Sequence, residues 1–389
     1  MTAGQIIGND VRSNSETVGI LAELRRYLEP EPPAISLPPR AFTSPELYEL
    51  ERTRIFGRSW ILIAHTDQLA TPGDYVALTI AGEPLVVTRD KNGALHGMSP
   101  VCRHRMMPVV EPGAGNTTSF TCPYHLWRYG LDGRLIGATF MRGNPDFDPQ
   151  ACRLPAFAVQ EWHGFVYVNL DPHAAPLTPH LSTISSELTN YQLNEMVQVT
   201  TWIEEWHCNW KIAVENAHEN YHAMGLHPNT VEPLMSGAID MSVRADSALV
   251  TRMLSPFREP IEPAVLSLTE EEKAVMYSFR VFPCSSVATF GDAIVWISLI
   301  PLSIDRTEVR GGTLLPAAMV EGADLEVIRK EGAESSAVIN AEDQRGLEAV
   351  QRAVGSRFTE RGHLSPKEPG VLAFYRNLAL AMVENGDEI

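Results

Sequence analysis

The stretch CRHRMMPVVEPGAGNTTSFTCPYH, residues 102–125, decides how the first half of this chain is interpreted. It contains Cys102 and His104, then 17 intervening residues, and then Cys122 and His125. Gly and Pro residues surround both pairs and predict loops rather than regular structure. Two such loop tips can grip one metal centre, because thiolates and imidazoles are both good ligands for transition metals.

Two thiolates and two imidazoles are compatible with two kinds of metal centre. One is a structural zinc ion, and the other is a Rieske [2Fe–2S] cluster, in which two Cys hold one iron and two His hold the other. Zinc sites with this ligand set usually pair Cys with Cys and His with His. Because each loop here supplies one Cys and one His, the pattern favours the cluster, with zinc as the alternative.

Working outward, the sequence from 60 to 170 alternates short β-type runs with turns. The runs WILIAHT, DYVALTI, PLVVTRD and GFVYVNL are separated by Pro-Gly, Lys-Asn-Gly and Leu-Asp-Gly. They predict an antiparallel β domain over residues 44–172, opened by a helix at 44–56 with Ser44 as its N-cap.

The spacing Cys-x-His, 17 residues, Cys-x-x-His, followed by LWRYGLDGRL, resembles the Rieske domain of the Rieske non-haem iron oxygenases, the ring-hydroxylating alpha-subunit family. Met106 and Leu126 depart from the commoner family pattern, in which Gly often follows the second His. Both lie beside the ligands, so the departures concern loop packing and redox tuning. The resemblance implies these ligands of the [2Fe–2S] cluster: Cys102, His104, Cys122 and His125.

A second group of metal-binding residue types lies in NWKIAVENAHENYHAMGLHP, residues 209–228. His222 and His227 are five residues apart, so on a regular helix they would point about 140° apart. Both can reach one ion only if the helix breaks between them. Gly225 and Pro228 are residues that end helices, and we expect the break there.

A carboxylate should complete this site, because two His and one carboxylate leave positions open on a ferrous ion for O₂ and substrate. In the helix predicted at 339–354, Asp343 takes the one position of the apolar stripe between Ile339 and Leu347 that is not apolar. A buried carboxylate needs a partner, and a metal is a suitable one. Asp343 is therefore the predicted ligand, and Glu342, on a different face, is the fallback.

These segments resemble the family's mononuclear iron motif, Glu/Asp-x-Tyr-His-x4-His, and its carboxylate helix, here AEDQRGLEAVQR. The resemblance implies that iron is held by His222, His227 and Asp343. Asn216 is interpreted as a residue just outside the ligands.

Glu219, the acid before the first His of the motif, has a different implied role. By the resemblance it is not a ligand but an electron-transfer bridge from His222 to the cluster ligand His125 of a neighbouring subunit. Helical geometry alone leaves Glu215 and His218 as rivals, because both would share the face of His222. Only the register of the motif favours Glu219.

Blocks of helix-type and strand-type sequence fill the rest of the chain. Helix is favoured around 18–28, 181–230 and 321–357, and strands over 280–318. We expect an α+β protein: the antiparallel β Rieske domain and an α+β catalytic domain whose antiparallel sheet is surrounded by helices. The predicted units are an N-terminal helical segment at 1–43 that packs with the catalytic domain, the Rieske domain at 44–172, and the mononuclear iron domain at 173–389.

One helix in this half is expected to run from about Glu205 to Met224. Trp202, Trp206 and Trp210 recur every four residues, which predicts a helix face buried in the core. A cage that binds a cation over the aromatic rings is the alternative for these residues.

Composition limits the possible partners. The formal charge of −17 argues against nucleic acid or an anionic membrane surface, because both need clustered Lys and Arg. Five cysteines are too few for a disulfide framework in a chain of this length, and an odd number cannot all be paired. No secretory signal is visible near the first residue, so we expect a cytoplasmic protein.

The resemblance covers nearly the whole chain and implies the terminal oxygenase of a Rieske system. Electrons from NAD(P)H would arrive through a reductase or ferredoxin, and a homotrimer would bring cluster and iron of neighbouring subunits together. Because Glu219 stands where ring dihydroxylases more often have Asp, we favour monooxygenation of a small organic substrate, by hydroxylation or oxidative N- or O-dealkylation. The alternatives are cis-dihydroxylation of an aromatic ring, a Rieske electron-transfer protein, and a zinc-stabilised binding protein. The late strands offer these candidate pocket residues: Phe282, Phe290, Val295 and Trp296.

Overall fold

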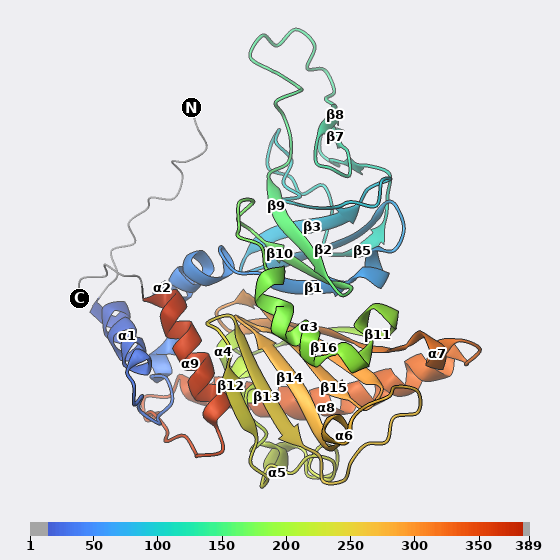
Figure 1. The fold of residues 1–389 in the computed structure, drawn as a ribbon. Coiled ribbons are helices and arrows are strands. Elements are labelled where there is room, and N and C mark those ends of the chain that lie inside the picture. Colours follow the sequence, from blue (N-terminus) through green and yellow to red (C-terminus); the bar gives the residue numbers. More distant parts are fainter. Residues whose placement is uncertain (1–14, 384–389) are drawn as a thin grey trace.

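The computed structural model describes residues 15–383. It consists of a smaller β domain and a larger domain in which helices flank a broad sheet (Figure 1). The predicted α+β class is therefore confirmed. The beginning of the predicted N-terminal segment, residues 1–14, lies outside the described residues, as do 384–389. Within the described part of the chain, no helix is long and apolar enough to cross a membrane.

Two antiparallel sheets form the smaller domain. One has the strand order β1-β10-β9-β4-β3-β2-β5, and the other has the order β6-β7-β8. Branched and aromatic residues favour these strands, and all five residues of β10, FVYVN, are buried. The strands are β1 (Ile61–His65), β2 (Asp74–Ile80), β3 (Glu83–Arg89), β4 (Leu95–Met98), β5 (Gly113–Asn116), β6 (Phe120–Thr121), β7 (Arg128–Tyr129), β8 (Leu135–Gly137), β9 (Ala156–Trp162) and β10 (Phe165–Asn169).

A seven-stranded antiparallel sheet forms the centre of the larger domain, with the order β11-β17-β16-β15-β14-β13-β12. The strands expected over 280–318 are confirmed as the last three along the chain. The strands that precede them, between 242 and 281, were not predicted. The bounds are β11 (Met196–Trp206), β12 (Ser242–Ala245), β13 (Val250–Pro256), β14 (Val275–Val281), β15 (Ser285–Phe290), β16 (Ala293–Ser303) and β17 (Arg306–Pro316).

The long helices Leu325–Val354 and Pro369–Met382 lie on one face of this sheet, here called the helical side, whereas the short helix Ser182–Glu187 and part of the smaller domain pack against the other (Figure 1). On the helical side, Asn340 donates to Glu204 and Asn377 donates to Thr251. On the other side, Trp296 packs in one core with Tyr167 of the smaller domain. The helices are α1 (Ser15–Arg25), α2 (Pro45–Glu51), α3 (Ser182–Glu187), α4 (Trp210–Ala217), α5 (Ala223–Leu226), α6 (Glu270–Ala274), α7 (Ala317–Val320), α8 (Leu325–Val354) and α9 (Pro369–Met382).

The predicted helices near the N-terminus are confirmed. Tyr27, just beyond α1, lies against Tyr375 of α9 with ring centroids 4.9 Å apart, so the N-terminal segment packs on the larger domain. The Ser44 hydroxyl accepts the Leu47 N–H at 3.3 Å and caps α2 as expected. After Glu51 the chain continues in a π-helical turn.

The long helix expected from about Glu205 to Met224 is wrong. Strand β11 runs to Trp206, α4 ends at Ala217, and the three tryptophans therefore do not share a helix face. The reason is that β11 pairs along its whole length with β17, and this pairing outweighs the apparent helical period of the tryptophans. Asn209 then caps α4 by accepting the N–H of Lys211.

Candidate metal centres

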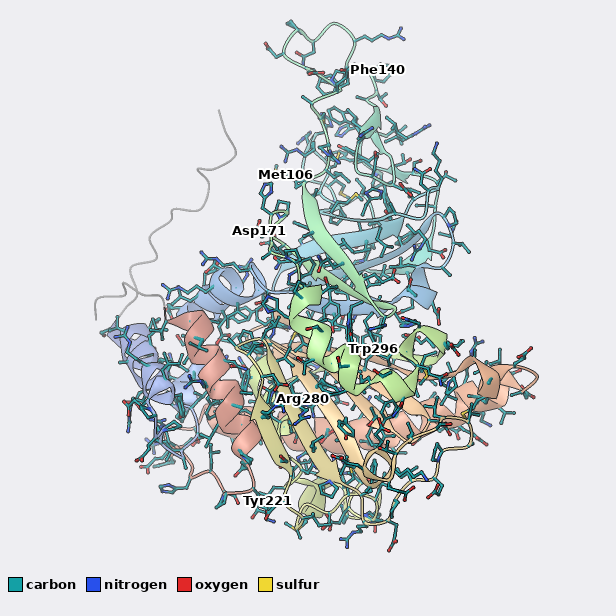
Figure 2. The ribbon with its side chains drawn as sticks, viewed as in Figure 1. Met106, Phe140, Asp171, Tyr221, Arg280 and Trp296 are labelled. Carbon is teal, nitrogen blue, oxygen red and sulfur yellow. The ribbon has the colours of Figure 1, made fainter. Side chains whose placement is uncertain are left out.

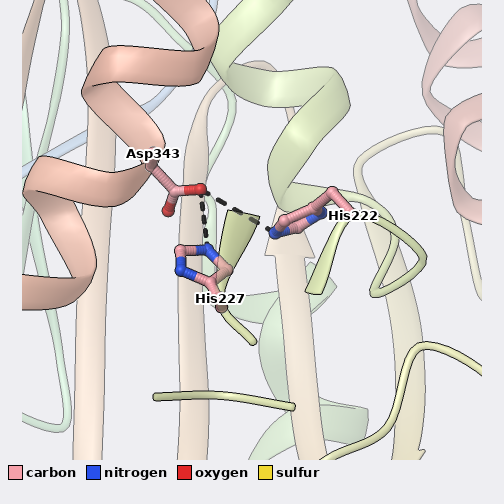
Figure 3. A group of neighbouring side chains, drawn as sticks. All are labelled: His222, His227 and Asp343. Atoms are coloured by element: carbon pink, nitrogen blue, oxygen red, sulfur yellow. Dashed lines mark hydrogen bonds and ion pairs between the residues drawn. The ribbon is translucent and has the colours of Figure 1, made fainter. Parts of the chain in front are cut away.

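Two His and one Asp converge on the helical side of the large sheet (Figure 3). Asp343 Oδ1 lies 2.9 Å from Nε2 of His227 and 3.8 Å from Nε2 of His222. One ligand atom from each residue lies within 4.8 Å of the others, and this is the one such group among residues 15–383. The predicted trio is therefore brought together, while its role as an iron site stays a prediction.

A very short helix produces this convergence. His222 is the N-cap of the four-residue helix α5 and His227 is its C-cap, while Asp343 comes from α8. Helix α5 ends at Leu226, between the two His and just before Pro228, so a helix end falls where Gly225 and Pro228 predicted it; the earlier break between Ala217 and His222 was not predicted. With only one turn between them, the two His do not follow the 140° separation of a long helix.

A carboxylate holds the far side of each His ring. Nδ1 of His222 donates to Glu219 Oε1 at 2.6 Å, and its backbone N–H donates to Oε2 at 3.0 Å. Nδ1 of His227 donates to Glu342 Oε2 at 2.8 Å. Since a carboxylate only accepts, both rings are kept in the tautomer whose Nε2 lone pair faces Asp343.

The two acids on α8 thus have different positions. Asp343 faces both His rings, while Glu342 lies behind His227 and also accepts the Thr230 hydroxyl at 2.6 Å. Hydrogen bonds to His227 and Thr230 lower the pKa of Glu342. Asn216 Nδ2 donates to Asp343 Oδ1 at 3.0 Å, which is the position just outside the ligands that the sequence suggested.

This donor set fits a ferrous ion. Two imidazole nitrogens and one carboxylate oxygen on one side leave the other side open, which is the facial arrangement of oxygen-activating iron sites. Outer carboxylates that orient ligand His rings are typical of metal sites and strengthen the ligands. His227 and Glu219 are buried, so this part of the site is shielded from solvent.

The two loops predicted to hold the cluster have the same backbone fold. Cys102 N donates to Met107 O and Cys102 O accepts from Met106 N, and Cys122 forms the same two bonds with Trp127 and Leu126. Met106 and Leu126 have φ angles of +57° and +60°. This is the left-handed region that favours Gly, so both side chains stand where the backbone would suit a Gly better.

Both sulfurs of this site are buried, and both rings lie toward the outside. Cys102 and Cys122 are 2% and 1% exposed, and the rings of His104 and His125 lie 4.5 Å apart. Nδ1 of His125 is buried without a hydrogen-bond partner. A buried ring nitrogen without a partner, at the tip of one of two matching loops, fits a site that holds a bound metal group.

The spacing of these four side chains bears on the zinc alternative. Ligands of one tetrahedral zinc ion lie about 3.3–3.8 Å apart. Among the described residues, the Cys102 group does not form a cluster with all donor atoms within 4.8 Å. A two-iron cluster spreads its Cys and His ligands over two metals and suits the wider spacing.

The four candidate pocket residues do not lie together. Val295 pairs with Ala288 and Thr313, and Phe290 is two residues from Ala288 on the same helical side of the sheet. Phe282 packs against Phe374 of α9. Trp296 must be removed from the set, because strand alternation turns it to the opposite face, where its Nε1 donates to Gln198.

Sequence reasoning missed two residues of this region. Thr230 supports Glu342, but a single Thr in a loop gives no pattern to find it by. Arg280 lies on the helical side of β14, opposite Thr251, and its Nε has no hydrogen-bond partner. A charged residue inside a strand that is otherwise buried, VMYSFRV, is the signal that could have identified it.

Two family models match the chain. The model of the Rieske [2Fe–2S] domain matches residues 59–155, and the ring hydroxylating alpha subunit (catalytic domain) matches residues 193–384. Together the matched segments span most of the chain.

Similar proteins agree with these matches. The glycine betaine monooxygenase oxygenase subunit of Pseudomonas aeruginosa is 27% identical over 91% of both chains, and that of Chromohalobacter salexigens is 29% identical over 81% of this chain and 80% of the relative. A solved quaternary ammonium Rieske monooxygenase has the same fold, with a TM-score of 0.79 and 24% identity over 92% of this chain and 98% of that one. Naphthalene 1,2-dioxygenase from Rhodococcus sp. also has it, with a TM-score of 0.78 and 22% identity over 96% and 99%.

Proposed function

This chain belongs to the Rieske oxygenase alpha subunits, and on that premise we propose that it removes an N-methyl group from a small quaternary ammonium compound by monooxygenation. The family makes it the terminal oxygenase of its system, with a [2Fe–2S] cluster, a mononuclear iron and electrons supplied by a partner protein. The observation that carries the choice of reaction is the similarity to glycine betaine monooxygenase subunits along 91% of both chains.

The proposed iron ligands are His222, His227 and Asp343, and the proposed cluster ligands are Cys102, His104, Cys122 and His125. When bound, the iron supplies reductive activation of O₂ with electrons that the cluster provides. The chain's own contribution is orientation, since Glu219 and Glu342 fix the His tautomers and Asn216 holds the Asp343 carboxylate.

Glu219 is proposed as the bridge that electrons cross between subunits. Its carboxylate already binds both the ring and the backbone of His222. In a closed homotrimer, His125 of a neighbouring subunit would approach Glu219 from outside, which needs a head-to-tail interface. The proposal includes a ferredoxin or reductase as donor, the domain limits 1–43, 44–172 and 173–389, and a cytoplasmic location.

The atoms and electrons of the proposed demethylation balance with O₂, protons and electrons from a partner protein. O₂, two electrons and two protons convert one N-methyl group into N-hydroxymethyl and one water. The N-hydroxymethyl ammonium then loses formaldehyde and one proton and leaves the tertiary amine. The two electrons come from NAD(P)H through the partner protein.

A second candidate is cis-dihydroxylation in the breakdown of aromatic compounds. It is favoured by the chlorobenzene dioxygenase alpha subunit of a Cupriavidus strain, which is 34% identical, but over only 48% of this chain and 42% of the relative. The shorter match makes this the weaker candidate.

The test combines metal analysis with product analysis. We expect about three irons and two acid-labile sulfides per chain, and formaldehyde from glycine betaine or γ-butyrobetaine when a competent reductase is supplied. Asp343→Ala should lose about one iron, keep the sulfide and release no formaldehyde. A cis-diol from an aromatic ring, with no formaldehyde from any N-methyl compound, would replace the proposal with the second candidate.

A further inference from the structure

Arg280 is a charged residue of the large sheet (Figure 2). It lies on the helical side, because its register partner Thr251 accepts a hydrogen bond from Asn377 of α9. In the strand register it lies opposite Thr251 of β13 and Ser286 of β15. The neighbouring Phe279 and Val281 belong to the core on the other face. Strand alternation therefore directs Arg280 toward α4 and α9.

Arg280 has no counter-charge in the part of the chain that the structure describes. Its Nε–H is buried and donates to no partner, and no carboxylate among residues 15–383 forms an ion pair with its guanidinium. Burial alone lowers the pKa of Arg280 to about 10. By comparison, Arg252 on the adjacent strand pairs with Glu187 at 2.6 Å, and Arg310 pairs with Glu308 at 2.8 Å.

The nearest titratable neighbour of Arg280 does not compensate its charge. His218 shares a small cavity with it, and burial and the positive charge of Arg280 lower the pKa of His218 to about 3. His218 is therefore neutral, and its Nδ1 donates to Val214 O at 2.7 Å. The cavity is completed by Thr251, Val281, Phe282, Pro283, Phe374 and Asn377.

This cavity lies next to the metal trio along the chain. His218 is followed directly by Glu219, whose carboxylate holds the ring of His222. The cavity offers about 10 Å³ to the centre of a water-sized sphere, which is about the room of one water molecule, so a carboxylate enters it only when neighbouring side chains move.

Two further polar groups on the same face lack partners. The hydroxyls of Ser278 and Ser255 are buried and form no hydrogen bond. Ser278 is two residues from Arg280 on β14, and Ser255 lies opposite Met276 on β13, so all three side chains share the helical face. Neither serine lines the cavity, so only the unpaired guanidinium of Arg280 bears on a ligand there.

The sign of the ligand follows from the charge. An unpaired, partly buried guanidinium is unfavourable unless an anion binds it, and a carboxylate matches its planar fork with two parallel hydrogen bonds. Residues 15–383 supply no such carboxylate, so a carboxylate of a bound ligand can take this position.

We propose that Arg280 binds the carboxylate of a zwitterionic substrate whose ammonium end lies toward His222, His227 and Asp343. This inference rests on the proposed function and adds the second recognition group of the substrate. The same carboxylate chemistry could also come from a free anion that merely neutralises Arg280, and the experiment separates the two sources.

The experiment measures binding to the holoenzyme by calorimetry with two matched pairs of probes. Glycine betaine is compared with choline, and γ-butyrobetaine with butyltrimethylammonium, so each pair differs in the carboxylate. We expect wild type to prefer the carboxylate member of at least one pair by about 10–100-fold, which is typical of a charge-assisted contact. Arg280→Gln should abolish this preference, and Arg280→Lys should keep part of it. If Arg280→Gln keeps the preference, or if acetate binds wild type as tightly as the carboxylate probes do, so that a free anion is enough, the proposal is wrong.

Arg252→Gln is the matched control, because it removes a similar charge from the adjacent strand on the opposite face, where Glu187 pairs with it. Its carboxylate preference should equal that of wild type. Thermal unfolding distinguishes a role in ligand binding from a role in stability. Arg280→Gln should not lower the Tm of the ligand-free protein, whereas Arg252→Gln should, because it breaks the ion pair with Glu187. A lower Tm for Arg280→Gln together with an unchanged preference would make Arg280 structural.

The outcome is also distinguishable from failure of the proposed reaction. Arg280-dependent carboxylate binding without formaldehyde release would keep the inference and overturn the demethylation. Equal demethylation of choline and glycine betaine by wild type would keep the reaction and overturn the inference.

Discussion

Glu342 and His227 are joined by a 2.8 Å hydrogen bond on the side of the imidazole that faces away from Asp343. The ring of His227 therefore lies between two acids that follow one another on α8, with Nδ1 bound to Glu342 and Nε2 facing Asp343. One helix thus supplies both a ligand position and the group that orients a second ligand. This arrangement makes the fallback residue of the sequence analysis a supporting residue of the same site.

Replacing Glu342 should weaken the iron site without removing a ligand. In Glu342→Gln the charge behind His227 is lost, and we expect about 10–100-fold weaker iron binding, as for other supporting carboxylates. The measurement is iron retained per chain against a graded chelator, with sulfide as the internal reference. Glu331→Gln, an exposed acid of the same helix, is the control. Equal iron retention in both variants would contradict the role.

Replacing Glu219 should separate the two metal sites electronically. Glu219→Gln keeps a hydrogen-bond acceptor for His222 Nδ1 but loses the charge, so we expect both metals to be retained. Turnover should fall at least tenfold, because the proposed path between the sites is interrupted. The test is reoxidation of the reduced cluster by O₂ in the presence of an N-methyl substrate. If the Glu219→Gln enzyme keeps its activity, Glu219 is not the electron-transfer bridge.

The left-handed conformation of Leu126 should cost stability. A non-Gly residue in this region costs roughly 1–2 kcal/mol, and the side chain is 60% exposed, so it gains little from packing. We expect Leu126→Gly to raise the free energy of unfolding by about 1 kcal/mol, and Leu126→Ala to leave it nearly unchanged. Thermal unfolding of the iron-loaded protein measures this. A lower Tm for the Gly variant would show that the leucine itself stabilises the loop.

The buried pair Lys211 and Glu51 offers a test of how α2 is attached to α4. Both side chains are 1% exposed, and Nζ lies 2.6 Å from Oε1. Lys211→Met alone should destabilise by about 3–5 kcal/mol, because it leaves the Glu51 charge buried. The double variant with Glu51→Gln should recover most of this loss, since Gln still accepts the Trp210 indole N–H. Denaturant titration of wild type, the single variant and the double variant measures their free energies of unfolding. If the double variant is no more stable than Lys211→Met, the argument is contradicted.

Sequence patterns predicted what depends on local alternation or on motif spacing. The strand Ser285–Phe290 and its two successors were predicted because apolar and polar residues alternate between clear turns. The trio of His222, His227 and Asp343 was predicted from the spacing of the two His, from the one non-apolar position in the stripe of the 339–354 helix, and from the family resemblance. Neither result required knowledge of distant contacts.

The rest depended on contacts between distant segments. Strand β11 contains the helix-like spacing of the tryptophans, and only its pairing with β17 makes it a strand. The strand β14 was missed because nothing in its sequence shows that β13 and β15 flank it. Arg280 and Thr230 each act through neighbours that lie far away in the sequence, so no local pattern identifies them.

The buried acid Glu215 should make stability depend on pH. Burial raises the pKa of Glu215 from 4.5 to about 8, although Tyr375 donates to it at 3.0 Å and Lys211 opposes the shift. The unfolded chain therefore loses this proton above about pH 4.5, while the folded chain keeps it to about pH 8. Because the folded state binds more protons in this window, stability falls as the pH rises, by up to about 1.4 kcal/mol per pH unit.

Glu215→Gln should remove this contribution, since Gln accepts the Tyr375 hydroxyl at every pH. Relative to wild type, we expect the variant to gain stability steadily from pH 5 to pH 8 and to change no further above that range. The comparison at each pH cancels the contribution of His218, whose lowered pKa makes stability rise with pH up to about 6.5 in both proteins. Thermal unfolding at four pH values measures the difference, with Glu331→Gln as the exposed control. A difference between variant and wild type that does not change with pH would show that Glu215 is ionised in the folded protein.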